Sequence, residues 1–282
     1  MSTNCSSSAC SSCASKGACP SQQAQSLQVQ PHAKTHIQQV IAVMSGKGGV
    51  GKSFVTTELA VSLRRKGLKV GILDADITGP SILKAFGLND VQARATHEGI
   101  LPIESRSGIK LMSINALLDT PSDPVVWRGP VIAGVVKQFW TDVIWGDLDV
   151  LLVDMPPGTG DVPLTVFQSL PVHGAVVVTT PQDLVTHIVE KSIKMGQKLN
   201  IPILGLIENF AWFTCPSCES RHLLYGASHA KSLTEAYHIP NLVQLPLRPE
   251  LPEMIDNGRA EMLELPELEA FVQAIRGAAH DC

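Results

Sequence analysis

The stretch Met44–Val55 reads M-S-G-K-G-G-V-G-K-S-F-V and decides the fold of this 282-residue chain. Its frame from Gly46 to Ser53 fits the phosphate-binding pattern G-x-x-x-x-G-K-[ST] at every fixed position. The apolar run Val40–Met44 before it predicts a buried strand, and the residues after it predict a helix. Because this is the context that the pattern requires, the stretch predicts a loop whose backbone N–H groups surround a phosphate.

Each residue of the loop has an expected part in binding a nucleotide. Lys52 is expected to reach the β- and γ-phosphates, and Ser53 to hold Mg²⁺. Lys47 is not required by the pattern, and a lysine at this place is typical of "deviant Walker A" ATPases, in which it leans across a dimer interface onto the partner's nucleotide. Backbone contacts are expected from the other residues, Gly46, Gly48, Gly49, Val50 and Gly51.

Composition and charge restrict the class of protein. The chain is 44% hydrophobic, which is enough for one α/β domain with an ample core. Its net charge of -4 provides no general attraction for DNA or anionic lipid. No apolar run approaches the ~20 residues that span a bilayer, and the N-terminus lacks the features of a secretory signal or a mitochondrial presequence. We expect a cytoplasmic protein without nucleic-acid or membrane partners, whose cysteines suit metal ligands better than disulfides.

The chain is expected to consist of an N-terminal extension and one folded domain. Residues 1–39 are rich in Ser, Ala, Gln and Cys, contain no Asp or Glu and lack hydrophobic periodicity, which predicts a flexible segment. Folding is expected to begin at Val40, so that the nucleotide-binding domain covers residues 40–282.

Strands and helices alternate along that domain. Strands are predicted at 40–44, 69–74, 150–153, 175–179, 203–207 and 242–245, with two shorter strand-like runs at 100–103 and 109–114. Helices are predicted at 51–66, 81–86, 131–145, 162–169, 183–199, 226–237 and 266–277. Continuous apolar strands alternating with helices predict an α/β fold with a mostly parallel sheet, helices on both faces, and ligands at the carboxyl ends of the strands.

Carboxylates follow two of the predicted strands. Asp74 and Asp76 come after the strand 69–74, where one of them could orient an attacking water or bind the water shell of a metal. Asp154 follows the strand 150–153 and suits a Walker B carboxylate, and Gly158 offers an N–H that could sense a γ-phosphate. Taken alone, each acid could be a helix cap or a solvated loop residue. Three elements at successive strand ends favour a nucleotide site.

Cys215 and Cys218 are separated by two residues, which points two thiolates at one metal centre. An iron–sulfur cluster or a tetrahedral zinc normally takes four ligands, so a second pair must come from this chain or from a second subunit. A two-fold axis would supply that pair, and a lysine that acts across an interface also presupposes a dimer. A redox dithiol or an unliganded pair remains an alternative.

The extension contributes four further cysteines, for which metal binding is favoured because a disordered segment has no core to bury them. They are Cys5, Cys10, Cys13 and Cys19. A rival arrangement joins Cys10 and Cys13 to Cys215 and Cys218 as one zinc site. A surface histidine and a terminal thiol, His222 and Cys282, are weaker candidates as ligands.

From about residue 38 to 276 the chain resembles the Mrp/ApbC family of iron–sulfur cluster carrier ATPases, relatives of the nitrogenase iron protein and MinD. The resemblance is carried by Gly46–Ser53, Asp74–Ser81 (D-A-D-I-T-G-P-S), Trp127–Pro130 (W-R-G-P), Asp154–Asp161 (D-M-P-P-G-T-G-D), Glu208–Phe210 (E-N-F) and Cys215–Cys218 (C-P-S-C). It implies ATP and Mg²⁺ as cofactors, slow ATP hydrolysis, and a homodimer bridged by a [4Fe–4S] cluster. That cluster would be received from an upstream assembly scaffold and passed to apo iron–sulfur proteins.

The resemblance also implies roles for individual residues. Asp76 becomes the switch I carboxylate near the γ-phosphate, Asp154 belongs to switch II, and Asn209 contacts adenine, although a strand-end turn would also explain an asparagine there. The spacing from Cys10 to Cys19 is similar to the N-terminal cluster motif of eukaryotic cytosolic carriers. Cys5 departs from that motif, because only four residues separate it from Cys10.

Two other functions fit the same superfamily. An electron-transfer protein like the nitrogenase iron protein would use the bridging cluster as a redox centre, although its ligands are widely separated cysteines rather than one C-x-x-C. A positioning ATPase of the MinD or chromosome-partitioning type would bind a membrane or DNA. The segment Glu264–Glu269 is acidic where a lipid-binding helix should be basic, which argues against the second alternative.

Overall fold

The computed structural model describes residues 28–77, 79, 81–118 and 129–280. An eight-stranded sheet forms its centre, in the order β12-β9-β8-β1-β7-β2-β6-β5. The strands are β1 (His36–Ser45), β2 (Val70–Asp74), β5 (Ile103–Glu104), β6 (Lys110–Met112), β7 (Asp147–Asp154), β8 (Gly174–Thr179), β9 (Ile203–Glu208) and β12 (Leu242–Gln244). All neighbours pair in parallel except β5 and β6 at one edge.

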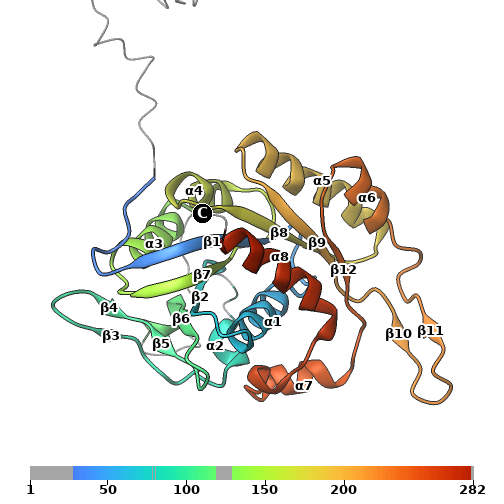
Figure 1. Cartoon of the computed structure of the whole chain (residues 1–282), viewed down its shortest axis with the longest axis horizontal. Coiled ribbons are helices and arrows are strands. Elements are labelled where there is room, and N and C mark those ends of the chain that lie inside the picture. The colour runs from blue at the N-terminus through green and yellow to red at the C-terminus, as the bar shows by residue number, and fades with distance from the viewer. Residues whose placement is uncertain (1–27, 78, 80, 119–128, 281–282) are drawn as a thin grey trace, which may run out of the picture.

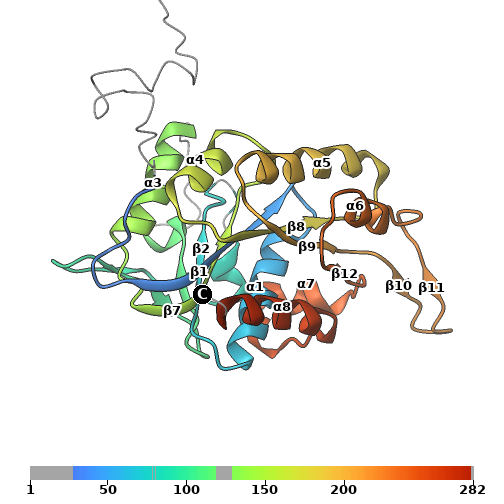
Figure 2. The ribbon, with the colours of Figure 1, turned by 45° about the horizontal axis from the view of Figure 1, so that its top comes forward.

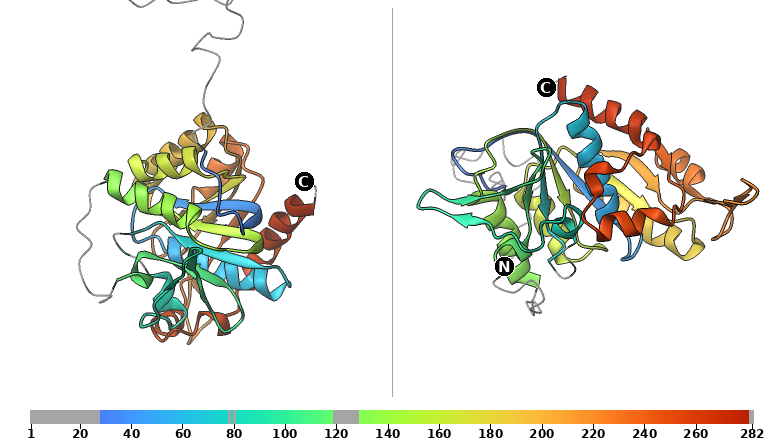
Figure 3. Two further views of the ribbon diagram at one scale, coloured as in Figure 1. Left: turned by 90° about the vertical axis from the view of Figure 1, so that its left-hand side faces the viewer. Right: turned by 90° about the horizontal axis from the view of Figure 1, so that it is seen from below.

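Helices cover both faces of the sheet, as Figure 2 and the side view of Figure 3 show. One face carries α3 (Gly129–Thr141), α4 (Asp161–Ser169), α5 (Asp183–Lys198) and α6 (Ala230–Ala236). The other carries α1 (Lys52–Arg65), α2 (Ile82–Ala85), α7 (Glu250–Asp256) and α8 (Glu269–His280). Because both faces are covered, strands such as β2 and β8 are buried along their whole length. The predicted fold class is confirmed.

Smaller elements complete the fold. Two antiparallel hairpins project at opposite ends of the molecule in Figure 1: β3 (Arg94–Ala95) with β4 (Ile100–Leu101), and β10 (Phe213–Thr214) with β11 (Arg221–His222). The described residues also form 3₁₀ turns at η3 (Ile114–Ala116), η4 (Ala260–Met262) and η5 (Pro266–Leu268). None of the helices within the described ranges is long and apolar enough to cross a membrane.

The first strand begins at His36, four residues before the predicted start at Val40. His36 pairs with Asp147 of β7 and its N–H donates to the Gly146 carbonyl at 2.9 Å. Three of the four residues 36–39 are polar, and backbone pairing with β7 holds this part of the strand, so no continuous apolar run marks it in the sequence. The chain just before the strand is also fixed, because the Trp140 indole N–H donates to the Val29 carbonyl at 2.7 Å.

Other element boundaries differ from the predictions for local reasons. α3 ends at Thr141 rather than 145, because Val143 and Trp145 turn into the core ahead of β7. α6 spans only residues 230–236 of the predicted 226–237. α7 was not predicted, since it is seven residues long, contains Pro252 and buries only Leu251.

Candidate functional site

The loop between β1 and α1 takes the shape that its glycines allow. Gly49 and Gly51 have φ of 79° and 83°, in the left-handed region that favours glycine. A Cβ on Gly51 would lie 2.3 Å from Nδ2 of Asn209, and one on Gly46 would lie 2.6 Å from Cγ2 of Ile188. Close packing against residues that follow β8 and β9 therefore adds a second reason for glycine at these two positions.

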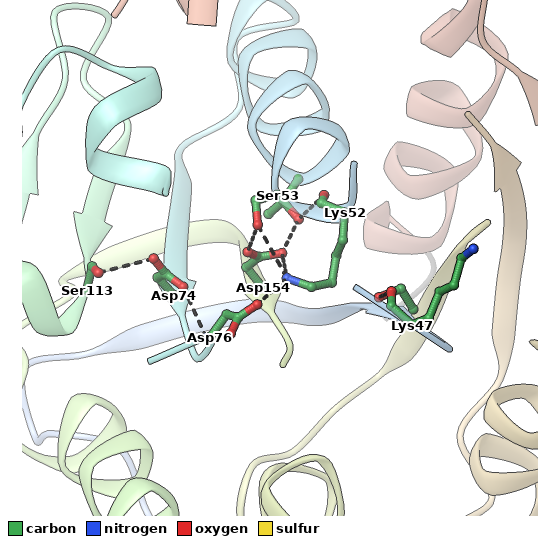
Figure 4. Close-up of polar contacts among 9 residues, drawn as sticks. Lys47, Lys52, Ser53, Asp74, Asp76, Ser113 and Asp154 are labelled. Carbon is green, nitrogen blue, oxygen red and sulfur yellow. Dashed lines mark hydrogen bonds and ion pairs between the residues drawn. The ribbon is translucent and has the colours of Figure 1, made fainter. Parts of the chain in front are cut away.

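Lys52 lies among carboxylates at the carboxyl edge of the sheet (Figure 4). Its Nζ is 2.8 Å from Oδ1 of Asp154 and 3.5 Å from Oδ2 of Asp76. The hydroxyl of Ser53 donates to Oδ2 of Asp154 at 2.6 Å, and that of Thr56 donates to Oδ1 at 2.7 Å. Asp154 is completely buried, so its charge is balanced by one ammonium and two hydroxyl groups. The structure brings Lys52, Ser53, Asp76 and Asp154 together at one site, as expected from the sequence. The contact of Thr56 was not predicted.

Asp74 forms the inner part of this cluster because β2 and β7 pair Asp74 directly with Asp154. Its carboxylate accepts hydrogen bonds from the Ser113 hydroxyl and the Asp76 N–H, both at 3.1 Å. Burial first, and then the nearby charge of Asp154, raise the pKa of Asp74 to about 8, although Lys52 acts in the opposite direction. Ser113 was missed at the sequence level. Its position inside the predicted strand-like run 109–114, directly after β6, was the available signal.

Lys47 points away from the carboxylates in Figure 4. Its Nζ donates to Oε1 of Gln182, at the start of α5, at 2.5 Å. The backbone of Gly158 is closer to the loop, since its N–H donates to the Ser45 carbonyl at 2.8 Å. Gly158 is therefore hydrogen-bonded to the last residue of β1, just before the phosphate loop. Lys47 lies outside the carboxylate cluster, because its ammonium group is bound to Gln182.

Asn209 follows β9 and contacts the phosphate loop directly. Its Nδ2 donates to the Val50 carbonyl at 3.1 Å, and its Oδ1 accepts from the Phe210 N–H at 3.0 Å. Beside it lies a cavity of about 250 Å³ with a mainly apolar lining that includes Gly51, Phe54, Phe210, Leu247, Leu251 and Ile255. An apolar cavity next to a phosphate-binding loop suits the flat ring of a nucleotide base.

Cys215 and Cys218 lie in the turn of the β10–β11 hairpin, which projects from the body in Figure 1. Backbone hydrogen bonds of 2.9 Å close the turn, from the Cys215 N–H to the Ser220 carbonyl and from the Glu219 N–H to the Cys215 carbonyl. The Cys218 sulfur is 2.9 Å from the Ser220 hydroxyl, which lowers the pKa of the Cys218 thiol. Both cysteines are free, and Cys218 is exposed.

Among the described residues, no other metal-ligating side chain joins these two thiols in a potential metal site. In that part of the chain no group of three or more His, Cys, Asp or Glu side chains could hold a metal ion. His222 instead hydrogen-bonds through Nε2 to the Ser220 hydroxyl at 2.9 Å. The other cysteines considered as ligands lie outside the described residues: Cys5, Cys10, Cys13, Cys19 and Cys282.

Several curated proteins are similar to this chain in sequence. A curated iron–sulfur cluster carrier protein of Methanocaldococcus jannaschii is 45% identical over 255 residues, covering 88% of this chain and 87% of that protein. A carrier of the same name from Clostridium perfringens is 42% identical, with 89% and 93% covered. A probable cytosolic Fe-S cluster assembly factor of Schizosaccharomyces pombe is 44% identical over 78% of this chain, which corresponds to 40% of that longer protein.

Solved structures agree with the fold. A nucleotide-binding protein of Archaeoglobus fulgidus in complex with ADP has 46% identity and a TM-score of 0.75, with 83% of this chain and 92% of that one covered. The septum site-determining protein MinD of Pyrococcus horikoshii shares the fold at 22% identity and a TM-score of 0.59, with 86% and 96% covered.

A family model also matches almost the whole described domain. The model for "ParA: NUBPL iron-transfer P-loop NTPase" aligns with residues 36–280, which begin at β1 and end with α8. The resemblance to iron–sulfur cluster carrier ATPases is thereby confirmed. This chain belongs to the NUBPL-type iron-transfer P-loop NTPase family.

Proposed function

We propose that this protein is an ATP-binding and ATP-hydrolysing iron–sulfur cluster carrier, which holds a [4Fe–4S] cluster between two copies of the chain and transfers it to apoproteins. The observation that carries the proposal is the pairing, on one chain, of a nucleotide-type lysine and carboxylate site with an exposed C-x-x-C turn that offers only two thiols. The names of its relatives support the same cargo.

The nucleotide would occupy the carboxyl edge of the sheet. Backbone N–H groups of 46–53 would surround the phosphates, and Lys52 would offset their charge. Ser53 and Asp154 fit Mg²⁺, since hydroxyl and carboxylate oxygens are the ligands it prefers and the two side chains are already in contact at 2.6 Å. Mg²⁺ would supply charge neutralisation at the phosphates. The apolar cavity beside Asn209 would take the base.

Hydrolysis requires a water to attack the γ-phosphate while the bond to the β-phosphate oxygen breaks. Asp76 would position that water, and its location beside Lys52 at the same edge supports this role. Gly158 would contact the γ-phosphate through its backbone, close to its present contact with Ser45.

The proposed cluster site needs a second subunit. Two thiols from each of two hairpins would complete the four ligands of the cluster. The residues that follow the hairpin support an interface there, since Leu223, Leu224 and Tyr225 expose 58%, 53% and 43% of their surface. Lys47 would leave Gln182 and reach the partner's nucleotide when the homodimer closes.

Several parts of the proposal rest on the sequence. The nucleotide-binding domain would begin with β1 at His36 rather than at the predicted residue 40, so the N-terminal extension would be shorter than residues 1–39. Cys10, Cys13 and Cys19, with Cys5 as a candidate fourth ligand, would bind a second cluster. The protein would act in the cytoplasm, receive its cargo from an upstream scaffold, and bind neither membrane nor nucleic acid.

Anaerobic purification followed by visible absorption spectroscopy and iron and sulfide analysis tests the proposal. The wild type should be brown and pass its cluster to an apo-acceptor, and Cys215→Ala/Cys218→Ala should lose the bridging iron and the transfer. Cys10→Ala/Cys13→Ala is the matched control, which should keep that iron. A colourless wild type that cannot be reconstituted would contradict the proposal. Full iron in the first variant would instead assign the metal to the N-terminal cysteines, and a reversibly reducible cluster that never leaves the protein would support electron transfer.

A further inference from the structure

Residues of α4 and α5 line a groove of about 710 Å³. Figure 2 shows these two helices on the face of the sheet opposite α1. Its apolar lining comes from Leu164 of α4 and from Met195 and Leu199 at the end of α5. Leu164 is 37% exposed, whereas the other two are half-buried and pack against the core. The groove is therefore a partly apolar trough between two helices.

Three lysines edge this trough. Lys191, Lys194 and Lys198 are spaced i, i+3 and i+7 on α5, which places them on one side of the helix. The described residues that line the groove include no Asp or Glu. Lys194 contacts Glu190 at 3.7 Å and lies 5.8 Å from the Tyr237 ring, whereas Lys191 and Lys198 form no ion pair within the described part of the chain. The groove is thus locally cationic in a protein of net charge -4.

We infer that this groove docks an acidic, amphipathic segment of a partner protein. Carboxylates spaced one helical turn apart would meet the lysine row, and apolar side chains between them would cover Leu164 and Met195. The inference goes beyond the proposed carrier function and does not depend on it.

Charge and shape together favour an acidic polypeptide over other polyanions. A nucleic-acid backbone would meet only three cations and would leave the apolar lining unused. A membrane would need apolar side chains that project outward, whereas these lie between two helices. A helix that carries both carboxylates and apolar side chains satisfies the two features at once.

The position of the groove relates it to the nucleotide edge. Thr159 lines its end and directly follows Gly158, whose N–H donates to the Ser45 carbonyl. A docked segment would therefore lie one residue from the loop that contacts the phosphate-binding loop.

Fluorescence anisotropy with the full-length protein tests the inference. The probe is a labelled 16-residue helical peptide with glutamates at i, i+3 and i+7 and leucines beside them. We expect saturable binding that falls at least tenfold in Lys191→Gln/Lys194→Gln/Lys198→Gln and several-fold in Leu164→Ser. Lys34→Gln/Lys66→Gln/Lys231→Gln removes the same charge elsewhere and should bind as the wild type does. A peptide with glutamine in place of glutamate should not bind.

Several results would overturn the inference. Equal binding by both triple-lysine variants, no effect of Leu164→Ser, or no binding of the peptide at all would each do so. Binding of phosphatidylglycerol vesicles or duplex DNA that is lost only in the groove variant would assign the lysines to lipid or nucleic acid instead. Iron content and ATP hydrolysis of the groove variant should match those of the wild type, so this outcome is separate from any failure of the carrier function.

Discussion

Lys52 and Asp154 form a buried ion pair, with Nζ 2.8 Å from Oδ1, in which Lys52 is 6% exposed and Asp154 not at all. The lysine therefore neutralises an acid of its own protein. A phosphate that enters the loop competes with Asp154 for the same ammonium group. Removal of either partner would leave the other as an uncompensated buried charge.

Replacing the lysine should affect both stability and binding. Lys52→Ala leaves Asp154 buried with only the hydroxyls of Ser53 and Thr56 as donors, so we expect a loss of about 3 kcal/mol in the free energy of unfolding. Urea denaturation measures this loss, and a fluorescent ATP analogue should no longer bind. Lys66→Ala breaks an exposed pair with Glu269 and should change neither property appreciably. Equal stability of the two variants would contradict the assigned role of the buried pair.

Asp76 should separate binding from hydrolysis. Asp76→Asn keeps the shape of the side chain but removes its charge, so ATP should still bind while the hydrolysis rate falls about 100-fold or more. Single-turnover phosphate release, compared with equilibrium nucleotide binding, makes the distinction. If binding and hydrolysis fell together, Asp76 would act on the nucleotide ground state and not on the water.

Substitution of Gly51 should be more damaging than substitution of Gly67, and comparison of the two separates the clash with Asn209 from backbone strain. Gly51 and Gly67 both have positive φ, 83° and 88°, but a Cβ would meet Asn209 only at Gly51, whereas nothing lies within 4 Å at Gly67. Gly67→Ala should therefore cost only the backbone strain of about 1 kcal/mol. Gly51→Ala should cost more and weaken nucleotide binding as well. Thermal denaturation and nucleotide titration of both variants test this. Identical behaviour would show that the Asn209 side chain can move away from the added methyl group without loss of stability or binding.

Glu58 should make stability depend on pH. Burial in α1 raises its pKa from 4.5 to about 8, with Arg65 acting in the opposite direction, and neither carboxylate oxygen has a hydrogen-bond partner within the described ranges. Between these two pH values the folded chain holds a proton that the unfolded chain releases. Stability should therefore fall as pH rises through that window, by up to about 1.4 kcal/mol per pH unit from this group.

Glu58→Gln removes that proton and should flatten the profile. Urea denaturation at pH 5, 6, 7 and 8 should show the variant losing less stability than the wild type toward pH 8. Glu235→Gln, on the exposed surface of α6, is the control and should keep the slope of the wild type. Parallel profiles for the wild type and Glu58→Gln would mean that Glu58 ionises at an ordinary pH.

The parts of the site that were predicted depend on local sequence or on one rule of sheet topology. The glycines of the loop can be recognised from their spacing. Asp76 and Asp154 can be placed because they follow apolar strands whose carboxyl ends lie at the same edge of the sheet. Ser113, Thr56 and Gln182 could not be assigned, because their contacts depend on which strand lies beside β2 and on how α5 packs.

The same distinction explains the fold. Long apolar strands can be predicted from their composition. The polar start of β1 at His36 cannot, because it is held by backbone pairing with β7, which no side-chain pattern encodes. The hairpin around Cys215 has two residues in each strand, too few for any periodicity to appear.

Asn209 lines the apolar cavity beside the phosphate loop, and Cys215 of the cysteine hairpin follows it by six residues. The intervening chain is stiffened by a second segment: the Ala211 N–H donates to the Leu245 carbonyl at 2.9 Å, and the Leu247 N–H donates to the Trp212 carbonyl at 2.7 Å. Leu247 also lines the pocket. A short, hydrogen-bonded piece of chain thus ties the hairpin to the cavity beside the phosphate loop, so a displacement of Asn209 would move the two thiols as well.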